Sequence, residues 1–211
     1  MVSVYTDMLK RNFGQKLGPD ADLYIYIGYV VEIGYVVEGA QRMEHLIKDL
    51  LAYTQVASVS DDPITLADAN ECLQSALSSL RRAIQESKAV ITHDSLPAVR
   101  MHRVHLEQLF QNLIGNSIKY RSKKEPQINI RAERRDAEWM FSVQDNGIAI
   151  DPQYWEQIFG IFKRLHSAAE YPGTGIGLAI SQKIVQRSGG RTWVESEAGQ
   201  GATLFFTVPE R

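Results

Sequence analysis

The segment Arg103–Tyr120 is the feature that most restricts the fold of this chain. Its apolar residues recur every three to four positions, the spacing that places side chains on one face of an amphipathic helix. Two runs of alternating apolar and polar residues follow it, Gln127–Ala132 and Trp139–Val143, around a charged turn. That alternation is typical of neighbouring β-strands. A strong helix followed directly by a strand pair indicates a domain that mixes helices with a sheet.

Further patterns in the second half of the chain agree with a mixed domain. They predict helices over Glu71–Glu86, Asp151–Phe159 and Ile176–Arg187, and strands over Ala89–Ile91, Arg191–Glu195 and Ala202–Val208. A Gly-rich turn separates the last two strands, which therefore form a pair. Because a sheet has to cover its apolar face, we expect a two-layer α/β sandwich with mostly antiparallel strands.

Residues 1–57 are predicted to be helical. An apolar stripe at helical spacing is interrupted by Gly14, Gly18 and Pro19, and a second stripe continues to Thr54. Two helices joined by a short turn form an antiparallel hairpin, which has too little interior to be stable alone. We expect half of a dimeric four-helix bundle. The α+β chain would then consist of the following parts: the hairpin at 1–57, a linker at 58–63 and the sandwich domain at 64–211.

The hairpin contains a tandem repeat, because IGYVVE occurs at Ile27–Glu32 and again at Ile33–Glu38. An insert of six residues turns a helix by about 600°, which rotates the upstream stripe by roughly 120°. The repeat also carries glycines, which are poor residues in a helix interior. We interpret it as a tolerated duplication that lengthens the helix. An effect on the register of the dimer is the alternative.

Composition excludes several classes of function. The 211 residues include 23 Lys and Arg against 25 Asp and Glu, and this near-neutral balance argues against a general nucleic-acid binder. Cys72 is the only cysteine, so neither an internal disulfide nor a cysteine-based zinc site is expected. The apolar stretch Leu23–Val37 is interrupted and too short to span a membrane, and no signal pattern precedes it. We expect a cytoplasmic protein without membrane contact.

Asn112 and Asn116 lie four residues apart in the predicted helix, so both amides lie on one face, with Lys119 one turn further on. Amide oxygens are suitable ligands for a hard cation such as Mg²⁺, and an ammonium group can approach a phosphate. The alternative is that both asparagines are solvated helix residues, and the helix alone does not decide between the two.

Three further motifs lie at turns. A predicted strand ends at Asp145, next to the turn signal Asn146–Gly147, and a carboxylate there could accept a hydrogen bond from an exocyclic amine. The glycines of Gly173–Gly177 precede a helix whose N-terminus would favour an anion. A glycine pair at 199–201 leads into a strand that carries Thr203. Each motif, taken alone, also fits an ordinary turn or hairpin.

Taken in order, these motifs resemble the ATP-binding domain of sensor histidine kinases and their relatives. The order is an asparagine-bearing helix, a strand ending in DNG, GTGIGL, and GQGAT leading into a strand. The resemblance runs from about Pro63 to the C-terminus, and IFGIFKRLH at 158–166 is similar to the phenylalanine box of that family. The kinase modules of phytochrome-like and PAS-linked sensors are the most similar. The resemblance implies ATP and Mg²⁺ as ligands.

The resemblance also implies roles for matching positions. Asp145 would accept a hydrogen bond from the adenine amine, Thr203 would assist through a water molecule, and Asn116 would hold Mg²⁺. The residues from about 163 to 172 would form a mobile lid. The other nucleotide-binding positions implied are Tyr120, Gly147, Ile148, Ala149, Gly173, Thr174, Gly175, Gly177 and Leu178. The family usually has glycine at position 149, so Ala149 would narrow the base pocket slightly.

The residue at position 112 bears on the type of reaction. Relatives that hydrolyse ATP carry a water-activating glutamate there, whereas the amide of Asn112 cannot accept a proton near neutral pH. The resemblance therefore implies phosphoryl transfer to a protein side chain, with Asn112, Lys119 and Arg164 as catalytic residues. Arg164 would stabilise charge on the terminal phosphate. A solvated loop arginine is the alternative for that position.

The hairpin resembles the dimerisation and phosphotransfer domain of the same kinases, because Arg42–Val56 is similar to its second helix. The phospho-accepting histidine of that family would lie just before Met1. None of the five histidines replaces it. His93 precedes an acid, Asp94, but falls in a predicted strand-loop region of the sandwich, so autophosphorylation of this chain is not expected.

The leading interpretation is a homodimeric catalytic fragment of a sensor histidine kinase. It would transfer the γ-phosphate of Mg-ATP to a histidine, from which the receiver domain of a response regulator would accept it on an aspartate. A longer parent would add an upstream sensor domain. Two alternatives remain, a nucleotide-binding dimerisation module without kinase activity and a serine kinase similar to anti-sigma factors.

Overall fold

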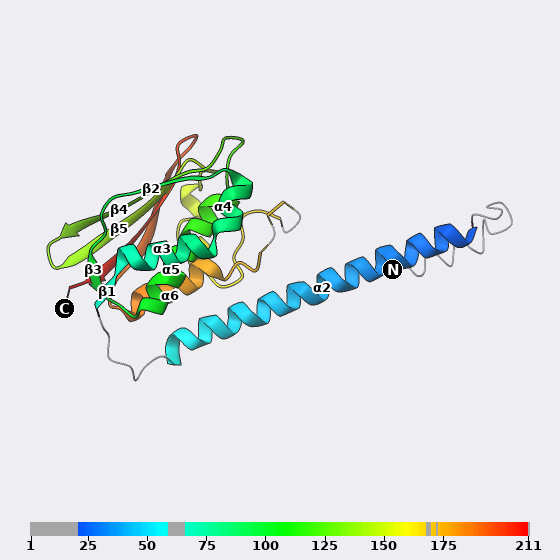
Figure 1. The fold of residues 1–211 in the computed structure, drawn as a ribbon, viewed down its shortest axis with the longest axis horizontal. Coiled ribbons are helices and arrows are strands. Elements are labelled where there is room, and N and C mark those ends of the chain that lie inside the picture. The colour runs from blue at the N-terminus through cyan, green and yellow to red at the C-terminus, as the bar shows by residue number, and fades with distance from the viewer. Residues whose placement is uncertain (1–20, 59–65, 168–169, 172, 211) are drawn as a thin grey trace. The chain divides into compact units, whose positions relative to one another are not determined.

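A computed structural model describes residues 21–58, 66–167, 170–171 and 173–210 (Figure 1). The chain divides into two compact units, Met1–Lys48 and Asp49–Arg211. Helix α2 (Ala21–Ser58) continues without a break through both copies of the IGYVVE repeat. The first arm of the predicted hairpin lies outside the described residues, as does most of the predicted linker, so the hairpin stays a prediction.

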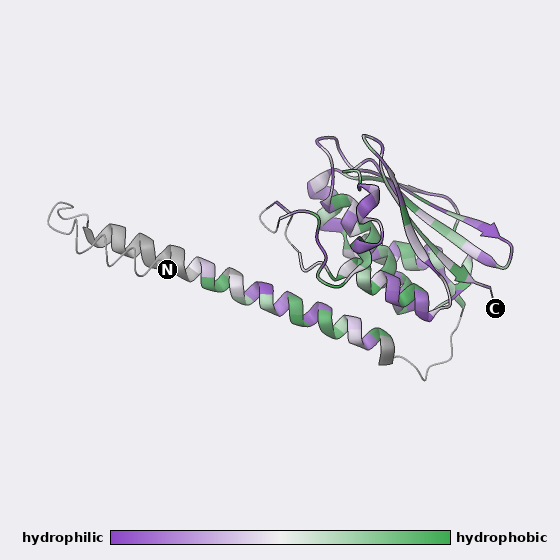
Figure 2. Ribbon diagram, turned by 180° about the vertical axis from the view of Figure 1, so that it is seen from behind, coloured by the Kyte–Doolittle hydropathy of each residue, from purple (hydrophilic) through white to green (hydrophobic). Residues whose placement is uncertain are grey.

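A five-stranded sheet forms one layer of the second unit. Its strand order is β2-β4-β5-β7-β6, with β2 parallel to β4 and every other neighbouring pair antiparallel. The strands are β2 (Val90–His93), β4 (Gln127–Arg135), β5 (Glu138–Asp145), β6 (Thr192–Glu197) and β7 (Gly201–Pro209). Buried residues alternate with more exposed ones in the first half of β4, so only one face of the sheet is covered (Figure 2).

Helices on that face form the second layer, which confirms the two-layer α/β sandwich (Figure 1). They are α3 (Ala69–Ser79), α4 (Arg81–Ser87), α5 (Arg103–Lys119) and α6 (Gly177–Arg187). A separate two-stranded antiparallel sheet joins β1 (Leu66–Asp68) to β3 (Ala98–Arg100). No helix in the described parts of the chain has both the length and the apolar character needed to cross a bilayer.

The core between the two layers is centred on three phenylalanines. Phe110 of α5 meets the rings of Phe141 and Phe206 edge-on, with 6.2 Å between centroids in each pair. Phe141 and Phe206 stack at 4.7 Å across β5 and β7. All three side chains are fully buried, and burial of one such ring contributes about 1.5–3 kcal/mol. These ring contacts fix the distance between α5 and the sheet.

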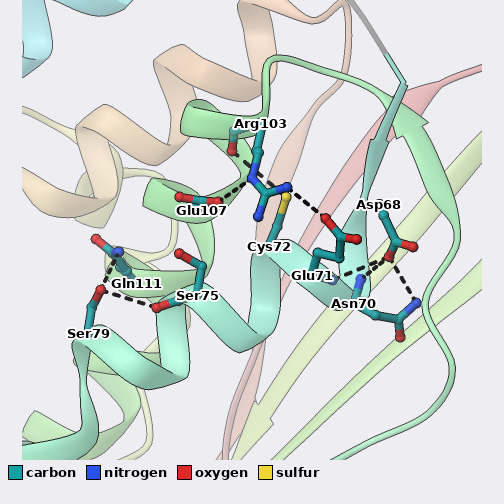
Figure 3. A network of polar contacts seen from close by, with 9 residues as sticks. All are labelled: Asp68, Asn70, Glu71, Cys72, Ser75, Ser79, Arg103, Glu107 and Gln111. Carbon is teal, nitrogen blue, oxygen red and sulfur yellow. Dashed lines mark hydrogen bonds and ion pairs between the residues drawn. The ribbon is translucent and has the colours of Figure 1, made fainter.

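A network of polar contacts fastens the start of α5 to α3 (Figure 3). Arg103 donates to Glu71 at 2.7 Å and to Glu107 at 2.8 Å. The pair with Glu71 is largely exposed on both sides, so it contributes little to stability. Below these ion pairs the thiol of Cys72 is buried 3.9 Å from the carbonyl oxygen of Arg103. Burial raises the pKa of this thiol to about 11, so Cys72 is an uncharged packing residue.

Three sequence-based expectations about the elements need correction. The predicted helix at 151–159 is instead two short 3₁₀ turns, η2 (Pro152–Tyr154) and η3 (Gln157–Phe159). The helix predicted over 71–86 is divided at Leu80 into α3 and α4. Strands β1 and β3 were not predicted, because three residues are too few to show an alternating pattern.

Candidate functional site

A cavity of about 90 Å³ lies beside the second half of α5. Its wall is mostly apolar, and its polar groups come from α5, from the end of β5 and from the segment after η3. The lining residues are Asn116, Ser117, Tyr120, Asp145, Ile148, Ala149, Ile150, Ile158, Lys163, Arg164, Leu165, His166, Leu178, Ala202 and Leu204. A mostly apolar cavity with a few converging polar groups is the usual form of a small-molecule site.

Asp145, the last residue of β5, supplies a carboxylate to this cavity. Its Oδ2 accepts a hydrogen bond from the hydroxyl of Ser117 at 2.8 Å. Its Oδ1 accepts from the backbone amides of Gly147 at 2.9 Å and Ala202 at 3.3 Å. Burial nevertheless raises the pKa of Asp145, and the three hydrogen bonds only partly oppose that shift. The carboxylate is therefore an oriented group in a poorly solvated place.

The loop after Asp145 is held tightly against the end of α5. The amide of Ile148 donates to the carbonyl oxygen of Tyr120 at 2.9 Å. A Cβ on Gly147 would lie 2.5 Å from that same oxygen and 2.9 Å from Oδ1 of Asp145. Only glycine fits this close approach, and the loop thereby brings Ile148 and Ala149 to the cavity wall.

The two asparagines of α5 lie on one face, as predicted, but their contacts differ. Asn116 lines the cavity, and its side-chain amide makes no hydrogen bond to any described residue. Asn112 is not among the lining residues, because its amide donates to the carbonyl oxygen of Gly177 at 3.1 Å. It also lies 3.5 Å from the hydroxyl of Ser181. Asn112 thus joins α5 to the first turn of α6.

Lys119 and the lid glycines meet next to this cavity. The ammonium of Lys119 lies 4.6 Å from the ring centroid of Tyr120. A Cβ on Gly173 would fall 2.6 Å from that ammonium. Gly173, Thr174, Gly175 and Gly177 all lie outside the cavity lining, in the segment that leads into α6, whereas Leu178 contacts the cavity.

Aromatic rings connect α5 to the described parts of the predicted lid. Tyr120 lies 5.9 Å from His166 and 5.1 Å from Tyr171, and the last two rings are 5.2 Å apart. Arg164 lines the cavity, and its guanidinium donates to the carbonyl oxygen of Tyr171 at 2.5 Å. These described lid residues therefore contact one another and Tyr120.

Thr203 is placed differently from the expectation that it assists Asp145. Ala202 and Leu204 line the cavity, and side chains alternate along a strand, so Thr203 of β7 points to the opposite face of the sheet. There it is paired with Gln144 of β5 and Glu195 of β6. Thr203 is therefore not part of this lining, and its water-mediated role beside Asp145 stays a prediction, whereas the backbone amide of Ala202 contacts Asp145 directly.

Sequence reasoning missed several lining residues. Ser117 directly follows Asn116 and turns to the same cavity, so a search for donors near Asp145 would have found it. The apolar wall gives no motif, because aliphatic side chains at such positions look like ordinary core residues. The lining residues that were missed are Ser117, Ile150, Ile158, Lys163, Leu165, His166, Ala202 and Leu204.

The polar groups beside the cavity suit a Mg²⁺ ion that is bound by few protein oxygens. In the described residues no group of three His, Cys, Asp or Glu gathers to hold a metal ion. Magnesium needs no such cage, since it is usually held by one or two protein oxygens together with phosphates and water. The unbonded amide of Asn116 offers one such oxygen beside the cavity.

The chain belongs to the family described as histidine kinase-, DNA gyrase B-, and HSP90-like ATPases, which it matches over residues 101–211. Its sandwich is a catalytic domain of the histidine kinase type, similar to those of phytochrome-like kinases. This family and fold agree with the resemblance drawn from the ordered motifs.

Two curated relatives and one solved structure show this likeness. The chain is 47% identical to cyanobacterial phytochrome A of Nostoc sp. over 99% of its length, covering 26% of that protein. It is 42% identical to the phytochrome-like protein Cph1 of Synechocystis sp., again over 99% of its length and 27% of the relative. The chain thus spans about a quarter of these relatives. The catalytic domain of histidine kinase ThkA superposes with a TM-score of 0.60 at 25% identity, over 69% of this chain and 95% of that domain.

Proposed function

We propose that the cavity binds Mg-ATP and that the domain transfers the γ-phosphate to a histidine side chain. The observation that carries the proposal is the carboxylate of Asp145, fixed by three donors inside an apolar cavity. An ionised carboxylate can only accept hydrogen bonds, so it selects a ligand with a donor at this point, as the amino group of adenine has.

The polar groups beside the base pocket provide the surroundings for a triphosphate. Asn116 would contribute an oxygen to Mg²⁺, which when bound neutralises charge on the phosphates. Lys119 and Arg164 are two cations near the lid, and Arg164 would exchange its bond to the Tyr171 carbonyl for the terminal phosphate. Asn112 cannot serve as a base for water, which favours transfer to a side chain over hydrolysis.

The partners follow from the same family. We infer a homodimer formed through α2, a histidine acceptor on a hairpin of this kind, and relay of the phosphate to an aspartate in the receiver domain of a response regulator. A cytoplasmic location and an upstream sensor domain in a longer parent complete the proposal. The relatives are phytochromes, which disfavours the serine kinase alternative.

Calorimetric titration of ATP with Mg²⁺ into wild type and Asp145→Asn tests nucleotide binding. We expect saturable binding to wild type and a loss of at least tenfold in the variant, because the amide places a donor where the ligand's own donor must bind. Asp94→Asn is the matched control, since Asp94 is an exposed carboxylate whose ion-pair partner is Arg131. Equal binding by wild type and Asp145→Asn would refute the assignment of the pocket.

A second experiment separates a kinase from a nucleotide-binding module. A hairpin that carries the family's acceptor segment HDLxxP is supplied as a separate chain, together with γ-labelled ATP. A kinase labels its histidine, and the label is lost in acid because phosphohistidine is acid-labile. Binding of ATP without any labelling would favour the non-enzymatic alternative.

A further inference from the structure

The two oxygens of the Asp145 carboxylate are held by different kinds of donor. Oδ1 accepts from two backbone amides, those of Gly147 and Ala202. Oδ2 accepts from one donor among the described residues, the hydroxyl of Ser117, at 2.8 Å. Backbone amides stay in place whatever the side chains are. The orientation of Oδ2 therefore depends on a side chain that substitution can remove.

Ser117 is built into the cavity. It is 3% exposed, it follows Asn116 on α5, and it lines the cavity together with Asp145. A serine hydroxyl has one hydrogen and two lone pairs. Because the hydrogen is donated to Asp145, the hydroxyl has only acceptor capacity left to offer a ligand.

We propose that Ser117 is a positioning and specificity residue for the nucleotide base. Its hydroxyl holds Oδ2 of Asp145 in one direction. Together, Ser117 and Asp145 offer a ligand hydrogen-bond acceptors and no donor at this point of the cavity. A base edge that meets the pair has to supply an N–H donor, as the amino group of adenine does. The carbonyl oxygen of hypoxanthine at the same position would face the acceptor oxygens of Ser117 and Asp145, so no hydrogen bond would form. This inference rests on the proposed binding of adenine nucleotides.

Removal of the hydroxyl has a different effect on the two bases. In Ser117→Ala the carboxylate loses one of its donors and can rotate, so the contact with an amino group weakens. A hydrogen bond to a charged group is among the stronger ones, and we expect about a tenfold loss of ADP affinity. Inosine diphosphate does not make this contact in wild type, so its affinity changes little. The ratio of ADP affinity to inosine diphosphate affinity therefore falls.

The pH dependence of binding gives a second readout. Burial raises the pKa of Asp145, and the hydrogen bond from Ser117 opposes that shift. Without the hydroxyl the carboxyl protonates at a higher pH, and the acid limit of ADP binding moves upward. The other titratable groups that line the cavity are the same in both proteins, so their effects cancel. They are Tyr120, Lys163, Arg164 and His166.

The experiment titrates ADP and inosine diphosphate into the full chain as wild type, Ser117→Ala and Ser87→Ala. Ser87 is the matched control because it is also a buried helical serine, whose hydroxyl donates to the Ala83 carbonyl at 2.6 Å outside the cavity. Ser117→Cys, which keeps the size but is a weak donor, should give an intermediate preference. Circular dichroism establishes that each variant is folded.

Two results would overturn the proposal. The first is an unchanged preference for ADP over inosine diphosphate in both Ser117 variants, including an equal loss of both affinities, which is what a merely structural role would produce. The second is a similar narrowing of the preference in Ser87→Ala. If wild type binds no adenine nucleotide, the proposed function itself fails, and that outcome is distinct from binding that is insensitive to Ser117.

Discussion

Asp145 places a carboxyl group where burial favours its neutral form. Burial raises the pKa of its carboxyl, and the hydrogen bonds from Gly147, Ser117 and Ala202 only partly compensate. A buried carboxylate of this kind lowers the stability of the fold at neutral pH. Its presence in a cavity wall therefore points to selection for binding rather than for stability.

The first prediction follows from this raised pKa. Between the pKa of an unfolded aspartate, about 3.9, and the higher value in the fold, the folded protein binds more protons than the unfolded chain. Asp145 therefore reduces stability progressively as the pH rises through that range. Without nucleotide, Asp145→Asn should melt above wild type at pH 7, because Asn keeps one acceptor and cannot ionise. The difference should shrink on acidification, as followed by thermal unfolding between pH 4 and 8. A variant that melts below wild type at pH 7 would contradict this account.

A pair of glycine substitutions gives the second prediction. Gly147→Ala places a Cβ 2.5 Å from the Tyr120 oxygen, so the loop has to move, and we expect at least a tenfold loss of nucleotide affinity with about 1–3 kcal/mol of destabilisation. Gly115→Ala, within α5, is the control, since beyond its own helix the nearest atom to its Cβ would be Leu80 Cδ2 at 3.9 Å. It should stabilise the fold by about 0.5–1 kcal/mol and leave binding unchanged. Calorimetry measures the nucleotide affinity, and urea unfolding measures the stability. Gly147→Ala has to lower the free energy of unfolding and Gly115→Ala has to raise it.

Individual site residues were predictable where a motif specifies the chemistry. Asp145, Asn116 and Ile148 line the cavity, whereas their roles towards a nucleotide stay predictions. Ala202 lines the cavity and Thr203 does not, because alternate residues of β7 point to opposite faces of the sheet. A shift of one residue moves a side chain to the other face of a sheet. The local sequence GQGAT does not indicate which of its residues points to the cavity.

At the scale of elements, the third prediction uses the two faces of β7. Phe206 is fully buried against Phe110 and Phe141, whereas its neighbour Phe205 stacks on Trp193 at 5.0 Å on the open face. Phe206→Ala should cost about 3–5 kcal/mol of unfolding free energy, and Phe205→Ala less than half of that. Urea unfolding of both variants measures the contrast. Equal costs would mean that the open face is packed like the core.

Long periodic elements were predicted within a few residues of their ends, as α5 and α6 show. The stretch at 151–159 looked helical, but Pro152 begins a turn that already ends at Tyr154, and Gly160 follows η3 in an extended conformation. Burial of Ile158 and Phe159 and contacts with α6 hold η3, and Trp155 donates to the Ile150 carbonyl oxygen at 3.0 Å. The geometry of these turns therefore depends on tertiary structure that a sequence pattern does not contain.

For the whole molecule, the fourth prediction concerns assembly through α2. Four apolar side chains near its C-terminal end are 46–60% exposed in the single chain, and their spacing forms one stripe. They are Met43, Ile47, Leu50 and Leu51. Ile47→Glu should weaken dimerisation at least tenfold in analytical ultracentrifugation, because a charge would be buried in the dimer. Gln41→Glu, off the stripe, is the control and should sediment as wild type does. Monomeric wild type at all concentrations would argue against the bundle.

The donors to Asp145 join segments that are 28 and 57 residues away from it in the chain. A ligand that binds this carboxylate therefore reinforces α5, the loop after β5 and β7 at once. Any ligand that binds only the folded state adds stability by mass action, about 2.7 kcal/mol at a concentration one hundred times its dissociation constant. With the proposed nucleotide as that ligand, resistance of the domain to proteolytic turnover would follow the nucleotide supply of the cell, and starvation would shorten the lifetime of the protein.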